Sequence, residues 1–159
     1  GTGASPGGSG GATIGQNSQL SQTLFGSGGG GSANSTYSSG GEKGGGMVIL
    51  IGKTITITGS ITSNGNSTSA GGPGGSTVTA GGAGAGGSIL LIGQTLSIGT
   101  NLITAIGGTG ATANNGNRGG NGGAGRVHLI ACSLTGTTNP TAYQVVGGQN
   151  FCGALAEII

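Results

Sequence analysis

The chain has 159 residues, of which 44 are glycine, and it carries only two acidic residues, four basic residues, one histidine and two cysteines. Acid–base catalysis needs pairs of titratable groups in one pocket, and a surface that follows phosphates needs clustered positive charge. The composition therefore predicts a protein that is neither an enzyme nor a nucleic-acid binder, and that holds no metal ion or cofactor.

Order is the second question that the composition raises. Chains rich in glycine and serine are usually flexible, but disordered chains are also charged and poor in β-branched residues. This chain has few charges and several dense Ile/Val/Leu runs, so it predicts an ordered all-β fold with essentially no helix. No apolar stretch reaches the roughly 18 residues of a membrane helix, and no signal peptide is visible at Gly1, where a targeting segment could already have been removed.

Residues 1–43 are expected to form a degenerate first unit of a repeated array within a single domain, 1–159. A glycine block precedes Ala12–Gly15, and Leu20–Phe25 has the composition of a short strand. The serine-rich stretch 26–41 is the loosest part of the sequence. A terminal unit that departs from its neighbours is normal in such arrays.

One phrase then recurs along the chain. Residues 44–57 read GGGMVILIGKTITI, residues 86–98 read GGSILLIGQTLSI, and a weaker copy at 125–134 reads GRVHLIACSL. Gly52 and Gly93 occupy matching positions 41 residues apart. A period near 40 predicts a β-solenoid or stacked β-sheets, with units at 44–84, 85–124 and 125–159, the last including a C-terminal strand.

Each copy predicts two kinds of strand. The continuous apolar runs Met47–Ile51 and Ser88–Ile92 are typical of strands covered on both faces. Thr54–Thr58 alternates, so its isoleucines are expected on one face and its threonines on the other. Gly52 and Gly93 lie between the two kinds of run, where glycine favours a bulge or a bend. Further strands are predicted at 60–63, 102–106, 142–146 and 154–159.

The glycine blocks have a period of their own. Residues 7–12, 71–76 and 119–125 follow a Gly-Gly-x pattern, and Gly81, Gly84 and Gly87 continue the spacing of three. Three residues per turn is the geometry of the polyproline-II helix, which has no internal hydrogen bonds. The blocks are therefore expected to pair with neighbouring segments, with flexible loops between strands as the alternative.

Cys132 and Cys152 are the only cysteines, and with His128 they make three potential zinc ligands where a structural site needs four. His128 and Cys132 could form a nucleophilic pair, but at about 3.3 Å per residue they would lie about 13 Å apart on one strand. An intrachain disulfide between Cys132 and Cys152 is the preferred interpretation, and it indicates an oxidising, extracellular setting.

Three weaker signals concern the surface. Asn34 and Asn66 begin N-glycosylation acceptor patterns, for which unmodified loop asparagines are the alternative. Thr54, Thr56 and Thr58 form a row like that of ice-binding solenoids. In the second copy Thr95 and Ser97 are followed by Gly99, so an ordinary solvated strand face is preferred. The four aromatic residues are scattered, and they suit gap filling in a core better than stacking on sugars.

The last segment, 154–159, ends in two β-branched apolar residues and has no charged cap. An open strand of this kind invites pairing with a second subunit, and a head-to-tail contact that does not close produces a filament. The candidate residues for self-assembly are Leu155, Ile158 and Ile159.

The pattern at 81–98, followed by 103–108, resembles glycine-rich repeat surface proteins of microbes, which look like parallel β-helices with glycine-rich insertions. The Gly-Gly-x blocks are also similar to the polyglycine-II bundles of phage tail-tip adhesins and glycine-rich antifreeze proteins. The array pattern, the scarcity of charge and the open C-terminal strand together favour an extracellular or cell-surface structural protein that polymerises with itself into a filament or surface layer. The alternatives are an adhesin that presents glycine-rich loops to a glycan or cell surface, and an ice-binding protein.

Overall fold

The computed structural model describes residues 7–13, 25–33, 38–71, 79–113, 116–147 and 152–153. This part of the chain is mostly β, and apart from helical backbone at Cys152 and Gly153 it contains no helix. In chain order the strands are β1 (Ser32–Ala33), β2 (Ser38–Ser39), β3 (Met47–Ile51), β4 (Thr54–Thr56), β5 (Ile61–Thr62), β6 (Ala70–Gly71), β7 (Thr79–Ala80), β8 (Ser88–Thr104), β9 (Arg126–Asn139) and β10 (Tyr143–Val146).

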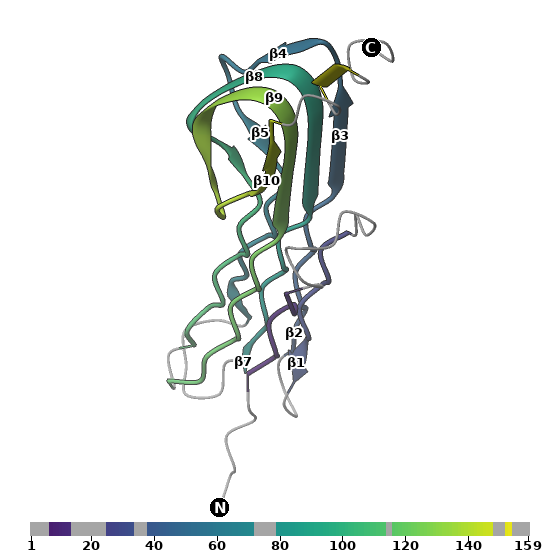
Figure 1. Ribbon diagram of the computed structural model, residues 1–159. Coiled ribbons are helices and arrows are strands. Elements are labelled where there is room, and N and C mark those ends of the chain that lie inside the picture. Colours follow the sequence, from purple (N-terminus) through teal and green to yellow (C-terminus); the bar gives the residue numbers. More distant parts are fainter. Residues whose placement is uncertain are drawn as a thin grey trace, which may run out of the picture.

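The molecule is elongated, with a β cap at one end and a bundle of glycine-rich segments at the other (Figure 1). The cap is a six-stranded sheet in the order β10-β9-β8-β3, in which β4 and β5 also pair with β8. All of its strand pairs are parallel. The sheet is open at β10 and at β3, and it is not closed into a solenoid.

The register of the cap follows the sequence phrases. Met47 lies opposite Ser88 and Thr54 lies opposite Thr95, so the offset of 41 residues between the phrases is also the offset of the strand pair. β8 rises, curves over the top of the cap and descends, and β9 follows the same path beside it (Figure 1). Parallel pairing of this kind brings equivalent apolar positions into contact along the whole arch.

The core lies on the inner side of this arch. Its fully buried side chains alternate within short runs of β8 and β9, and the phase changes along β8 between Leu91 and Leu96. Ala105 follows β8, and partly buried isoleucines from β4, β5 and their flanks pack against this set. This alternation fixes the register, because a slip by one residue would turn the apolar set to the solvent. The buried members are Ile89, Leu91, Leu96, Ile98, Ile103, Ala105, Val127, Leu129 and Ala131.

Below the cap, six glycine-rich segments surround a seventh, the central segment 80–87. Every residue of the central segment is buried, and it exchanges backbone hydrogen bonds with all six neighbours. The neighbours also bond to one another in a closed ring. In order around the ring they are 7–11, 26–30, 41–46, 63–68, 105–111 and 119–125.

The hydrogen bonds within the bundle recur every three residues. The N–H groups of Gly8 and Gly11 donate to the carbonyls of Ala80 and Ala83, both at 2.8 Å. The N–H groups of Gly120 and Gly123 donate in turn to the carbonyls of Gly8 and Gly11. Three residues is the repeat of a threefold extended helix, which leaves all its backbone groups free for its neighbours. The described glycine blocks are therefore packed segments rather than loose connectors.

Several strand predictions are corrected by the structure. Met47–Ile51 is not covered on both faces, since Ile49 is 47% exposed and Ile51 is 61% exposed. It also lies at the edge of the sheet, with a neighbouring strand on one side only. The stretch 102–106 is not a separate strand, since β8 continues from Ser88 to Thr104. The bend predicted at Gly52 and Gly93, by contrast, is present: β3 ends at Ile51, the chain bends at Lys53 and β4 begins at Thr54. It causes no change of register, and the register shifts lie later in β8, between Ser97 and Ile103.

Those shifts have a backbone cause. Gly99 has a φ of 64°, Asn101 has a φ of 53°, and Gly136 on the facing strand has a φ of 113°. Left-handed conformations interrupt the pleat and turn the chain, so the arch descends after this point. Residues 20–24 and 154–159, for which strands are also predicted, lie outside the described part of the chain.

Candidate functional site

Three chain reversals gather at the end of the bundle that lies away from the cap, here called the loop end (Figure 1). β1 pairs with β2, β6 pairs with β7, and Thr112 forms an antiparallel bridge with Arg118. Ala80 and Ala113 are buried together there, with Ala111 packed against them. The described parts of these reversals therefore form one joined surface rather than separate loops.

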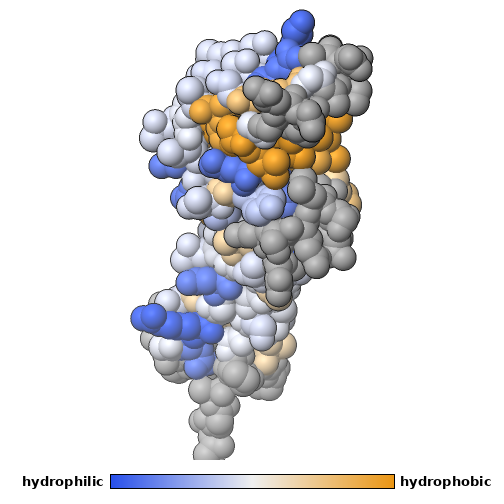
Figure 2. Space-filling view, in the orientation of Figure 1, coloured by the Kyte–Doolittle hydropathy of each residue, from blue (hydrophilic) through white to orange (hydrophobic). Residues whose placement is uncertain are grey.

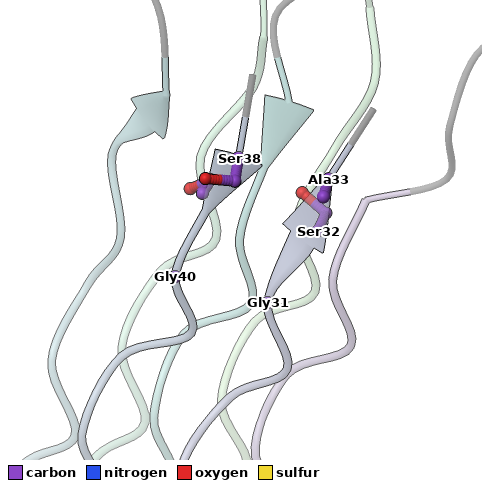
Figure 3. Close-up of a pocket in the computed structure, with 6 residues that line it drawn as sticks. Gly31, Ser32, Ala33, Ser38 and Gly40 are labelled. Carbon is purple, nitrogen blue, oxygen red and sulfur yellow. The ribbon is translucent and has the colours of Figure 1, made fainter. Parts of the chain in front are cut away.

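The loop end contains an open pocket of about 330 Å³ (Figure 3). Two of its serine hydroxyls already have partners. The Ser32 hydroxyl donates to the Ala80 carbonyl at 2.9 Å. The Ser39 hydroxyl donates to the Ser69 carbonyl at 3.2 Å and accepts from the Gly81 N–H at 3.0 Å. None of the described lining residues is charged, so this part of the pocket offers shape and polar groups rather than ionic recognition. Its lining residues are Gly31, Ser32, Ala33, Ser38, Ser39 and Gly40.

A second surface is the apolar outer edge of the cap, formed by Ile49, Leu50 and Ile51 of β3 and here called the β3 edge. Their side chains are 47%, 38% and 61% exposed. Figure 2 shows a continuous hydrophobic area on this side of the cap. Among the described residues, β3 pairs only with β8, so its other edge presents unpaired strand backbone. Apolar side chains beside an open strand edge are typical of a site that another strand joins.

One polar side chain is buried toward the opposite edge of the sheet, where β9 pairs with β10. His128 on β9 is 4% exposed, and its ring lies 5.7 Å from that of Tyr143 on β10. The His128 Nε2 atom has no hydrogen-bond partner among the described residues. Burial and, to a smaller extent, the positive charge of Arg126 lower the pKa of His128 below its usual value of 6.5. His128 is therefore neutral at physiological pH and acts as part of the packing.

A disulfide joins Cys132 and Cys152, the pair proposed from the sequence. It ties the chain after β10 back to β9. Because both sulfur atoms are used in this bond, Cys132 is not available as a nucleophile for His128, and the Cys–His interpretation is wrong. The described residues contain no group of three or more His, Cys, Asp or Glu side chains placed to hold a metal ion.

The remaining predicted residues are distributed as follows. Asn66 is exposed on an outer segment of the bundle, where its N–H donates to the Lys43 carbonyl at 2.9 Å and its carbonyl accepts from the Gly84 N–H at 3.0 Å. Asn34 lies outside the described residues, as do the self-assembly candidates Leu155, Ile158 and Ile159. Asn66 is not among the residues that line the pocket.

Sequence reasoning missed both surfaces. The run Met47–Ile51 reads like Ser88–Ile92, and nothing within it marks one as an edge and the other as the centre. The place of Met47–Ile51 in the array could have identified it as an edge strand, because the first full unit of a stack has a neighbouring unit on one side only. The pocket of the loop end had no signal beyond its glycine and serine content.

Comparison with protein-family models, with curated proteins and with solved structures gives no match for this chain. In the described part of the chain, no helix has the length and apolar character needed to cross a membrane.

Proposed function

We propose that this chain is an extracellular structural protein whose copies join head to tail through strand pairing into a filament or a surface layer. The observation that carries the proposal is the β3 edge: an open edge of a parallel sheet lined by exposed Ile49 and Ile51. The sequence suggested the C-terminal segment for this role. The proposal now rests on β3, which the structure describes.

The two ends of the sheet are complementary in direction. β10 and β3 are the outermost strands, and each runs parallel to its inner neighbour. A second copy that places its β10 edge against β3 therefore extends the sheet without reversing any strand. Because the two contacting surfaces differ, the contact is heterologous and leaves a free edge on each copy. Repetition of such a contact produces a filament.

The glycine-rich bundle supports this role as a stem. In the proposed architecture, units of about 40 residues each contribute one arch to the stacked β cap and two polyglycine-II segments to the bundle. The closed ring of six segments around residues 80–87 satisfies backbone groups internally with few charged or large side chains. The Cys132–Cys152 disulfide is consistent with an oxidising, extracellular compartment.

The test uses a charged residue at the edge. Wild-type protein is expected to form concentration-dependent oligomers in light scattering and filaments or sheets in negative-stain images. Ile51→Lys should remain monomeric, because a lysine on an edge strand opposes pairing. Thr62→Lys, an exposed substitution on β5 in the same cap, is the matched control and should assemble normally. Dispersed wild-type monomers at all concentrations would refute the proposal.

A second candidate function, an adhesin that binds a glycan or cell-surface receptor, is favoured by the loop end. A stem that holds three reversals and a pocket at its far end is suited to presenting them. Saturable binding of the monomeric Ile51→Lys protein to a glycan array or to cells would favour it. Ser38→Tyr, which places a ring in the pocket, should then reduce binding, whereas Thr62→Tyr should not.

A further inference from the structure

The curved top of the cap carries a regular set of hydroxyl groups, here called the hydroxyl grid. Thr54 of β4 lies opposite Thr95 of β8, which lies opposite Ser133 of β9. Two residues further along each strand, Thr56, Ser97 and Thr135 form a second row in the same register. The six hydroxyls therefore form two rows of three, across strands that belong to all three sequence phrases.

These side chains face water. Thr54, Thr56, Thr95, Ser133 and Thr135 are exposed and Ser97 is half-buried. None of the six hydroxyls makes a hydrogen bond to another described residue, so each keeps its donor and its two acceptor positions for solvent. This sets them apart from the serines of the loop end, whose hydroxyls are bonded to the backbone.

The grid is held in place from below. The residues between the two rows are Ile55, Leu96 and Leu134, and their side chains belong to the core. Leu96 has no exposed surface, while Ile55 and Leu134 are partly buried against it. With the intervening residues packed inward on three neighbouring strands, the hydroxyls are forced outward and their mutual spacing is set by the sheet.

That spacing is regular in two directions. Neighbouring strands lie about 4.8 Å apart, and alternate residues on one strand lie about 6.6 Å apart. These values are close to the separations between oxygen atoms on a face of ice. Water molecules held at these spacings would lose less entropy on joining a crystal. Four of the six residues are threonines, whose methyl groups fill the space between hydroxyls.

We propose that the hydroxyl grid binds ice. The inference does not depend on self-assembly, because all six residues lie in one chain. It also revises the interpretation of the threonine row from sequence. Of the three threonines in that row, only Thr58 has no equivalent on the neighbouring strands. At the positions of Thr54 and Thr56, β8 and β9 also carry a threonine or a serine.

The experiment measures ice growth with the full, disulfide-bonded chain. Wild-type protein is expected to show thermal hysteresis, to shape ice crystals and to inhibit recrystallisation. Thr95→Tyr should abolish all three effects, because a ring at the centre of the grid separates the other hydroxyls from the ice. Thr62→Tyr, the same change on β5 outside the grid, should leave them unchanged. Circular dichroism and thiol titration verify that both variants are folded.

A second variant tests the proposal independently in case Thr95→Tyr does not fold. Thr135→Lys changes the outer strand of the grid, where a long side chain remains in solvent, and it should also abolish ice shaping. Ile51→Lys should retain full activity, which separates this proposal from that of self-assembly. Wild-type protein that leaves ice growth unchanged, or grid variants as active as wild type, would overturn the inference.

Discussion

The most specific prediction about the glycine bundle concerns Gly84, which lies in the middle of the central segment. A Cβ atom at this position would lie less than 3.0 Å from the carbonyl oxygen of Lys43, and so would overlap backbone rather than a movable side chain. The N–H of Gly84 donates to the Asn66 carbonyl at 3.0 Å, and its own carbonyl accepts from the Gly108 N–H at 2.9 Å. Gly84→Ala must therefore displace the segment that contains Lys43, and this movement disturbs the hydrogen bonds to Asn66 and Gly108.

The magnitude follows from these contacts. Overpacking of a dense interior costs about 1–3 kcal/mol, and each of the two backbone hydrogen bonds contributes about 0.5–1.5 kcal/mol. The free energy of unfolding should fall by about 2–6 kcal/mol, which corresponds to a decrease in Tm of about 5–20 °C for a chain of this size. The neighbouring Ala83 and Ala85 are also fully buried, so the expected effect comes from the missing space at Gly84 and not from alanine as such.

Chemical denaturation followed by circular dichroism measures the effect. Gly46→Ala is the matched control, since a Cβ atom there meets nothing within 4 Å. This control should be neutral or more stable by up to about 1 kcal/mol, because alanine restricts the unfolded chain. If Gly84→Ala unfolded at the wild-type denaturant concentration, or if Gly46→Ala were equally damaging, the close packing of the bundle would be refuted.

Four further predictions concern the cap. Leu96→Ala removes a fully buried side chain and should lower the free energy of unfolding by about 2–5 kcal/mol in urea titrations. Ile51→Ala, at a side chain that is 61% exposed, should change it by less than about 0.5 kcal/mol. Replacing both Cys132 and Cys152 with serine opens a loop of 20 residues and should cost about 3 kcal/mol, seen as a Tm about 6–12 °C lower; an unchanged Tm would contradict this. Burial lowers the pKa of His128, so the unfolded chain takes up a proton first as the pH falls below about 6.5, and stability should decline from that pH downwards. His128→Gln should make that decline shallower, and an identical pH profile would argue against a buried neutral imidazole.

The spacing of the repeated phrases matches the strand pairing of the cap. The phrases at 44–57 and 86–98 are aligned by an offset of 41, and their strands pair with that offset. Alternation at Thr54–Thr56 correctly placed the threonines outward and Ile55 inward. A two-residue period reports directly which face a side chain occupies, so patterns of this kind can be read without knowing the neighbours.

Other features depended on which strands lie next to one another, and the sequence pattern does not show this. Met47–Ile51 was predicted to be covered on both faces, but Ile49 and Ile51 are exposed in this edge strand, whereas the equivalent residues of β8 are buried or partly buried. The threonine row Thr54, Thr56 and Thr58 was discounted because the second phrase has Gly99 at the third position. In the structure, β4, β8 and β9 each contribute two hydroxyl residues to the grid. The order of the strands in the sheet determines both outcomes.

By itself, the sequence determined how few titratable side chains this protein has and the spacings at which its chain can pair. Its two acidic residues, its glycine period of three and its strand period of two are local properties, and they hold in any arrangement of the segments. Only the tertiary structure decided which glycine segment lies at the centre of the bundle, which apolar strand is left at the edge, and which hydroxyls stand together. These are relations between residues about 40 positions apart, and they depend on packing that no local pattern encodes.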